Sequence, residues 1–275
     1  MIKKSSGYEE IKICKWEDFD EAVRELDFRT WVFRGHYDAS FELKTSLYRM
    51  LEEVEDLIEK KKGKRQKLVK DRREEILLEK FQSTAHLYLK HSLPEINDKH
   101  TNRLEWNAIM QHYGTPTRLL DVTLSPYIAM YFALEKGSTD CCVFAFNHKI
   151  LKEFDEEYFS GEDFAKEVFA NRKGDRSFII PFDPSLKTER ILAQQGLFLV
   201  PSNNYETFNE ILKHYNLKRI ACKKIIIPSS LRLEGNIRLQ RMNITTKSLF
   251  PGLEGFCRSL RYEVMHNIKL LEKIC

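Results

Sequence analysis

The sequence contains 275 residues, of which 42% are hydrophobic and 31% are charged, and its formal net charge is +4. A chain of this length and composition can bury a sizeable core, and we expect one domain with an insertion. The small net charge excludes a molecule that is strongly basic throughout, but it does not exclude a local basic patch that contacts nucleic acid.

The six cysteines show no CxxC spacing, and the sequence shows neither a signal peptide nor a long apolar span. We therefore expect a reduced, cytoplasmic protein without a membrane segment. Cys141 and Cys142 are adjacent on an expected strand, so their side chains point to opposite faces and make a poor pair of metal ligands. The sequence predicts no metal site.

The chain begins with an expected strand over Ile11 to Cys14 and a helix in "WEDFDEAVREL", whose acidic first turn favours a helix start. The run Trp31 to Phe33 is typical of a short buried strand. Arg34-Gly35 then predicts the place where this strand reaches the surface and the chain turns. We expect Arg34 to extend from the sheet rim into a neighbouring cleft.

From Tyr48 to Leu89 apolar residues recur at helical spacing, with a break near Gly63. This pattern predicts one long helix or two helices. The basic run Lys60–Lys67 could contact the phosphates of a nucleic acid, because clustered cations displace counterions. Acidic residues flank the run on both sides, so a solvated helix face of alternating charge explains it as well and is favoured.

The stretch "TNRLEWNAIMQHYGTPTRLLDVTLSPYIAMYFALEKG" predicts a helix, a strand, a tight turn and a second helix. The first helix covers Asn102 to His112, and "TRLLDVT" is the strand. Ser125 is the expected N-cap and Pro126 the first residue of the second helix. Strand ends of this kind collect polar side chains, so we expect a site here.

Further along, "CCVFAFNH" and "IACKKIIIPSSL" predict strands, and Lys149 to Asn171 is expected to be helical or looping. "RILAQQGLFLVPS" predicts a strand pair or a bent strand with Gln195-Gly196 at the bend. A turn around Pro251-Gly252 precedes a closing helix. The alternation of helices and strands favours a mixed α+β domain.

Four segments together resemble the FRG-domain family, which occurs among bacterial and phage-associated proteins. They are "FRG" at Phe33 to Gly35, "QHYGTPTRLLDVTLSPYIAMYFA" at Gln111 to Ala133, "RILAQQGLF" at Arg190 to Phe198 and "LFPGLEG" at Leu249 to Gly255. The resemblance implies a single FRG domain over residues 1–275, with core motifs at about 25–262 and a helical insertion at about 48–112.

The same segments are more distantly similar to ADP-ribosyltransferases of the Arg-Ser-Glu type. This resemblance implies a split, mostly antiparallel twisted sheet and a cleft that binds NAD and transfers ADP-ribose to a macromolecular acceptor, plausibly in phage defence or as a toxin. The catalytic candidates are Arg34, Asp121, Thr123, Gln195 and His112. The cofactor-binding candidates are Arg34, Gly35, His36, Thr123 and Gln194.

The chemistry suits an arginine, since its guanidinium always stays charged and offers a rigid fork of donors to dinucleotide phosphates. Cleavage of the bond to nicotinamide passes through an oxocarbenium-like state that a carboxylate stabilises. Gln194 and Gln195, which occupy the position of the expected glutamate, carry no charge. Asp121, Glu189 and Glu254 are the possible substitutes.

Other interpretations stay open. Arg34 could pair with Asp121 in a purely structural role, with Arg118 competing for that carboxylate. A metal-independent RNase could use His36, His112 and Arg34 or Arg118. A non-catalytic module that binds a nucleotide or a partner would need no glutamate at all.

Overall fold

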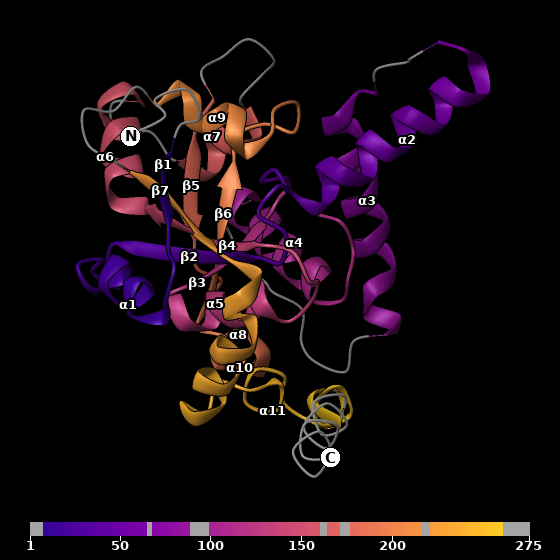
Figure 1. The fold of residues 1–275 in the computed structure, drawn as a ribbon. Coiled ribbons are helices and arrows are strands. Elements are labelled where there is room, and N and C mark those ends of the chain that lie inside the picture. Colours follow the sequence, from indigo (N-terminus) through magenta and orange to yellow (C-terminus); the bar gives the residue numbers. More distant parts are fainter. Residues whose placement is uncertain are drawn as a thin grey trace.

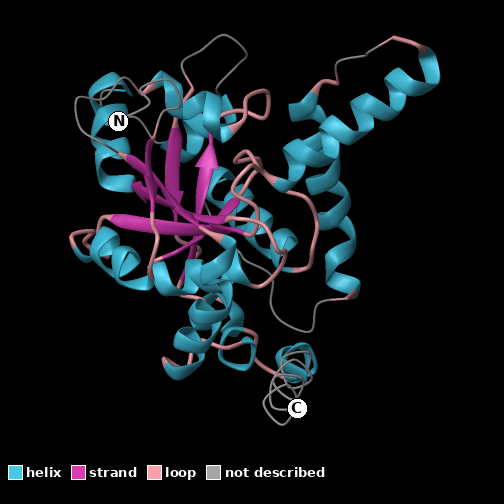
Figure 2. Cartoon of the chain, in the orientation of Figure 1, coloured by secondary structure: helices cyan, strands magenta, loops and turns pink. Residues whose placement is uncertain are grey.

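A computed structural model describes residues 8–64, 68–88, 99–159, 164–170, 177–215 and 221–260. A central sheet is enclosed by helices, and α2 and α3 lie beside it at the right of the view (Figures 1 and 2). The strands are β1 (Glu9–Lys12), β2 (Trp31–His36), β3 (Leu120–Thr123), β4 (Cys141–Asn147), β5 (Ile179–Phe182), β6 (Gly196–Pro201) and β7 (Cys222–Ile227).

The α-helices of the described residues are α1 (Trp16–Arg24), α2 (Ser46–Lys62), α3 (Lys70–Thr84), α4 (Lys99–His112), α5 (Pro126–Leu134), α6 (His148–Phe159), α7 (Phe164–Ala170), α8 (Glu189–Ala193), α9 (Phe208–His214), α10 (Arg232–Arg241) and α11 (Thr246–Leu249). Two short 3-10 helices are η1 (Ala85–Leu87) and η2 (Ser229–Leu231). Residues 253–260 are also helical. The expected α+β class is confirmed.

The strands form one open sheet in the order β1-β7-β4-β2-β3-β6-β5. Only the β1–β7 pair at one edge is parallel, and all other neighbouring pairs are antiparallel. The expectation of a mostly antiparallel sheet is therefore confirmed, whereas the expected split is not found, because the seven strands of the described residues form one continuous open sheet. β2 and β3 are nevertheless joined at a single registered pair, Phe33 opposite Thr123, so the two strands diverge beside this pair.

Two hydrophobic cores cover the two faces of the sheet. One core packs α4, α6 and α9 against Val32, Phe144 and Leu199. The other packs α1, α5 and α10 against Phe33, Val143 and Ile225. Alternate residues of β2 thus belong to opposite cores, as the period of a strand requires.

The helical stretch between β2 and β3 resolves the choice between one helix and two. α2 ends at Gly63, which has a left-handed φ of 67° and donates its backbone N–H to the Glu59 carbonyl, as a helix C-cap does. α3 begins at Lys70. The predicted break near Gly63 is confirmed, and α4 covers the predicted helix at 102–112.

The start of α5 is confirmed in detail. The Ser125 side chain accepts a hydrogen bond from the Ile128 N–H, and Pro126 is the first helical residue. Most of α5 is buried, because it crosses directly over the sheet.

Two local predictions are wrong, and one strand was not predicted. β2 continues through Arg34-Gly35 to His36, because both residues pair with β4 instead of turning. Residues 189–193 form α8 and not a strand, because Thr188 caps this short helix by accepting from the Ile191 N–H. β5, with the sequence "IIPF", was not predicted, and a proline within a strand is unusual. Its position at the sheet edge makes the proline tolerable.

Candidate ligand-binding site

A cavity of about 320 Å³ lies where β2 and β3 diverge. Its walls come from β2, β3, α5 and the chain after it, α8 and β6. The lining residues used below are Arg34, Gly35, Asp121, Thr123, Glu135, Lys136, Arg190 and Gln194. The ionisable members are three cations, Arg34, Lys136 and Arg190, and two carboxylates, Asp121 and Glu135.

Arg34 is held in the cavity wall by contacts with the neighbouring strand β3 and with His36 on its own strand. Its Nη1 donates to the Asp121 backbone carbonyl at 2.7 Å and lies 3.8 Å from Asp121 Oδ2. Its Nε donates to His36 Nε2 at 3.1 Å. Burial lowers the pKa of Arg34, and the Asp121 carboxylate opposes that shift. The Nη2 group has no hydrogen-bond partner within the described ranges, so it keeps two donors for a ligand.

His36 is a neutral acceptor. Burial and the positive charges of Arg34 and Arg49 lower the pKa of His36 to about 3. Its Nε2 receives the Arg34 N–H, so this nitrogen carries no proton at neutral pH. His36 therefore positions Arg34, and it is not one of the residues that line the cavity.

Gly35 is required by packing. A Cβ at this position would lie 1.9 Å from the Ala129 backbone oxygen and 2.6 Å from the Ala133 nitrogen. No side chain fits between β2 and α5 at such distances. Gly35 thus lets α5 approach the strand. This packing role explains the glycine without the expected contact with a cofactor.

Thr123 and Gln194 line the cavity, but their polar groups are engaged. The Thr123 hydroxyl donates to the Gln194 carbonyl at 2.8 Å and accepts from the Ser125 N–H at 3.1 Å. The Gln194 amide donates to the Leu249 carbonyl at 3.0 Å. These bonds join the end of β3, the turn after α8 and α11, so both residues serve mainly to shape the cavity.

Two predicted catalytic residues do not line the cavity. Gln195 has a left-handed φ of 47° in the turn between α8 and β6, and its side chain is exposed. Its carbonyl accepts from the Leu124 N–H. His112 lies at the end of α4 near Arg190, and burial together with the Arg190 charge lowers its pKa. The structure thus brings Arg34, Gly35, Asp121, Thr123 and Gln194 together and leaves Gln195, His112 and His36 outside the lining.

Glu135 is the carboxylate that sequence reasoning missed. It follows α5 directly, lines the cavity and is 17% exposed. Its Oε1 lies 2.6 Å from Arg258 Nη2, and this pairing holds the side chain in place. The signal in the sequence was an acidic residue at a helix C-terminus, where the helix dipole disfavours negative charge. The other proposed substitutes, Glu189 and Glu254, do not line the cavity.

The family comparison fits this part of the chain. Residues 29–141 match the family model of the FRG domain. The match begins just before β2 and ends at the first residue of β4, so it includes Arg34, Asp121 and Glu135. No curated protein and no solved structure matches the chain significantly.

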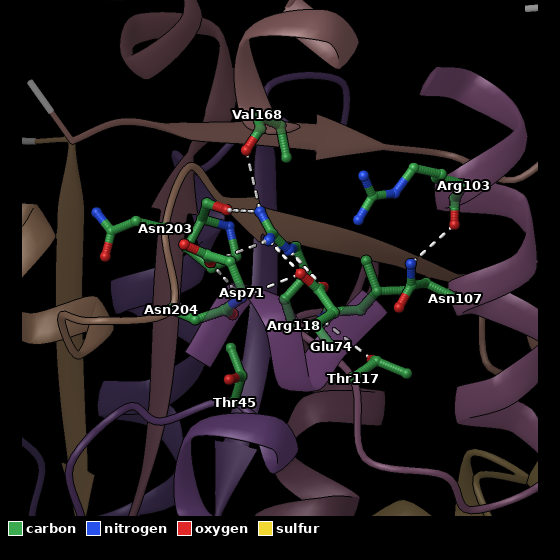
Figure 3. A network of polar contacts seen from close by, with 12 residues as sticks. Thr45, Asp71, Glu74, Arg103, Asn107, Thr117, Arg118, Val168, Asn203 and Asn204 are labelled. Atoms are coloured by element: carbon green, nitrogen blue, oxygen red, sulfur yellow. Dashed lines mark hydrogen bonds and ion pairs between the residues drawn. The ribbon is translucent and has the colours of Figure 1, made fainter. Parts of the chain in front are cut away.

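Arg118 is a structural residue. Its Nε donates to Glu74 Oε1 at 2.6 Å, its Nη2 donates to Glu74 Oε2, and its Nη1 donates to the Val168 carbonyl at 3.0 Å (Figure 3). Asn204 donates to the same carboxylate at 3.1 Å. Both members of the ion pair are almost completely buried. Arg118 is therefore not available to compete for Asp121 or to stabilise a substrate phosphate.

The basic run lies away from the cavity. Lys60, Lys61 and Lys62 form the last turn of α2, whose first residue Ser46 lies next to β3 through bonds with Thr117. The described lysines of the run are exposed, and residues 65–67 lie outside the described residues. A helix of this length places the run about 20 Å from Ser46.

In the part of the chain that the structure describes, no group of three or more His, Cys, Asp or Glu residues is arranged to hold a metal ion. Cys141 and Cys142 belong to opposite cores, as predicted. None of the helices among the described residues has the length and apolar character needed to cross a membrane.

Proposed function

We propose that the FRG domain binds NAD in the 320 Å³ cavity and transfers its ADP-ribose group to a macromolecular acceptor, with release of nicotinamide. The observation that supports this proposal best is the state of Arg34. This residue is largely buried, is fixed by two neighbours and still has an Nη2 group without a hydrogen-bond partner among the described residues. Such a guanidinium suits a pyrophosphate.

Arg190 and Lys136 add positive charge to the same cavity, and two carboxylates complete it. Glu135 and Asp121 are the candidates that stabilise the oxocarbenium-like ribose as the bond to nicotinamide breaks. The acceptor nucleophile then forms the new bond to the ribose carbon and loses its proton. Glu135 takes the role expected at Gln194 and Gln195.

We include in this proposal an ADP-ribosyltransferase-like arrangement, in which Arg34 on one strand faces a second strand that leads through Ser125-Pro126 into a buried helix. A cytoplasmic location and a role in phage defence or as a toxin belong to the same proposal. The identity of the acceptor is left open between protein and nucleic acid.

The first test is calorimetric titration with NAD of the wild type and Arg34→Gln. Loss of one charged hydrogen-bonding group typically costs about 1.5–3 kcal/mol, so we expect the Kd of the variant to rise about 10- to 100-fold. Arg72→Gln is the matched control, because Arg72 is an exposed helix residue paired with Glu75. Unchanged NAD affinity in Arg34→Gln, or no binding by the wild type, would contradict the proposal.

Nicotinamide release on the same samples tests the chemical step. Glu135→Gln should slow release by more than it weakens NAD binding, because the carboxylate acts on charge that develops only during cleavage. NAD binding without release, in the presence of cell extract as a source of acceptor, would instead support a binding module.

A further inference from the structure

A second cavity, of about 200 Å³, adjoins the first. Arg34, Gln111 and Asp121 line both, so they form the shared wall. The remaining walls of the smaller cavity come from the loop before α2, the first turn of α2 and the chain between α4 and β3. They contribute Lys44, Ser46, Arg49, Gly114, Thr115, Leu119 and Leu120.

The smaller cavity has an excess of positive charge. Arg34, Lys44 and Arg49 line it, and Asp121 is its one lining carboxylate. Lys44 is neutralised locally, since its Nζ lies 2.9 Å from Glu52 and 3.4 Å from Glu42. Asp121 is 64% exposed and its carboxylate lies 3.8 Å from the Arg34 guanidinium, so its single charge compensates at most one guanidinium. One guanidinium, that of Arg49, is left without a counter-ion.

Among the described residues, the guanidinium of Arg49 is held only by a backbone carbonyl. Its Nη1 donates to the Lys44 carbonyl at 2.7 Å, and no carboxylate of the described residues lies within 4.0 Å of its guanidinium. Its charge lowers the pKa of both Arg34 and His36, so the two arginines share one region of positive potential. An anion between them would relieve this repulsion.

The other polar groups in this cavity are largely engaged by the protein. Ser46 exchanges hydrogen bonds with the Thr117 backbone, and the Gln111 amide is bonded to Thr117 and Leu119. The donors left for a ligand are therefore those of the two guanidinium groups, together with the Thr115 hydroxyl. Planar forks of N–H donors match the oxygens of a phosphoryl group.

We propose that the smaller cavity is a phosphate subsite, in which Arg34 and Arg49 both donate hydrogen bonds to a phosphoryl group. This subsite goes beyond the proposed function, and its occupation does not require that the larger cavity bind NAD. The phosphoryl group can come from a phosphorylated form of the dinucleotide that spans both cavities, or from a separate phosphate or phosphate monoester.

Calorimetric titration with inorganic phosphate tests the subsite directly. We expect the wild type to bind phosphate and Arg49→Gln to bind it at least about tenfold more weakly, while Arg72→Gln binds like the wild type. Circular dichroism and thermal unfolding check that each variant is folded. Arg49 is exposed, so its replacement should leave the fold intact. Absence of phosphate binding by the wild type, or equal binding by Arg49→Gln, would overturn the proposal.

A second titration separates this proposal from the proposed function and identifies the source of the phosphate. Arg49 does not line the larger cavity, so Arg49→Gln should bind NAD like the wild type, whereas Arg34→Gln should lose both ligands. If NADP binds more tightly than NAD and this advantage disappears in Arg49→Gln, the dinucleotide supplies the phosphoryl group. If NAD and phosphate bind together without this NADP advantage, a separate molecule supplies it. Phosphate binding that depends on Arg49 without any NAD binding would retain the subsite and reject the transferase.

Discussion

Arg34 depends on an uncharged histidine. His36 accepts the Arg34 Nε–H while lying against the Phe144 ring, with the ring centroids 5.4 Å apart. A protonated imidazole has no acceptor and would face Arg34 and Arg49 as a third positive charge. The depressed pKa of His36, about 3, means that this arrangement persists through the physiological pH range.

The same residue makes stability depend on pH. The unfolded chain binds a proton at this histidine below about pH 6.5 and the folded chain does so only near pH 3, so stability falls as the pH falls between these values. His36→Gln keeps an acceptor for Arg34 but does not titrate. Between pH 6.5 and pH 5, the free energy of unfolding of the wild type, measured in urea, should fall by about 2 kcal/mol more than that of the variant. His86→Gln, which removes an exposed histidine, is the control variant, and equal slopes for all three proteins would refute the assignment.

At the scale of elements, a buried ion pair fixes α3 beside β3. Glu74 projects from α3 to Arg118, which lies two residues before β3, and Arg118 also donates to the carbonyl of Val168 on α7 (Figure 3). The pair therefore attaches the helices that follow β2 to the part of the sheet that carries Asp121. Because the pair is buried, removal of one charge leaves the other without compensation.

Glu74→Gln should destabilise the protein by about 3–5 kcal/mol, as measured by urea unfolding, because the Arg118 guanidinium stays buried. Glu75→Gln, on an exposed neighbour paired with Arg72, should change stability by at most about 0.5 kcal/mol. A loss of similar size in both variants would show that the pair is not the attachment.

On the scale of the whole molecule, residues near the C-terminal end of the described chain complete the cavity built by its middle. The Leu249 carbonyl accepts from Gln194, and Arg258 pairs with Glu135. Phe250 lies between the guanidinium groups of Arg190 and Arg258, whose carbons are 4.7 and 3.9 Å from the ring centroid. Segments far apart in sequence thus fix three residues of the larger cavity.

Phe250→Ala should therefore affect the two cavities differently. Removal of a buried phenylalanine costs about 3–5 kcal/mol in stability and frees Arg190, so NAD binding should weaken. Phosphate binding in the smaller cavity should not change, since neither Phe250 nor Arg190 lines that cavity. Leu253→Ala, at an exposed position, should leave NAD binding and phosphate binding unchanged. Equal loss of both ligands would show that the two cavities do not act separately.

The sequence by itself determined the local elements whose signals lie within a few residues. The Ser125-Pro126 helix start, the break at Gly63 and the buried strand at Trp31–Phe33 were predictable, because caps, left-handed turns and apolar runs are local interactions. The same local patterns named Arg34, Asp121 and Thr123 as neighbours of a site, since polar residues at strand ends commonly line one.

Only the tertiary structure decided which of these residues share a cavity. A turn was predicted at Gly35, whereas the glycine is required by packing, since a Cβ at this position would lie 1.9 Å from the backbone of α5. The sequence does not show this contact, because the two segments are nearly a hundred positions apart. Glu135 was not predicted to line the cavity, because its carboxylate is held by Arg258, which lies 123 residues away in the sequence. Arg49 received no role, because its position depends on how the first turn of α2 meets β3. Long-range packing has no local signature, and the divergence of β2 from β3 is a consequence of such packing.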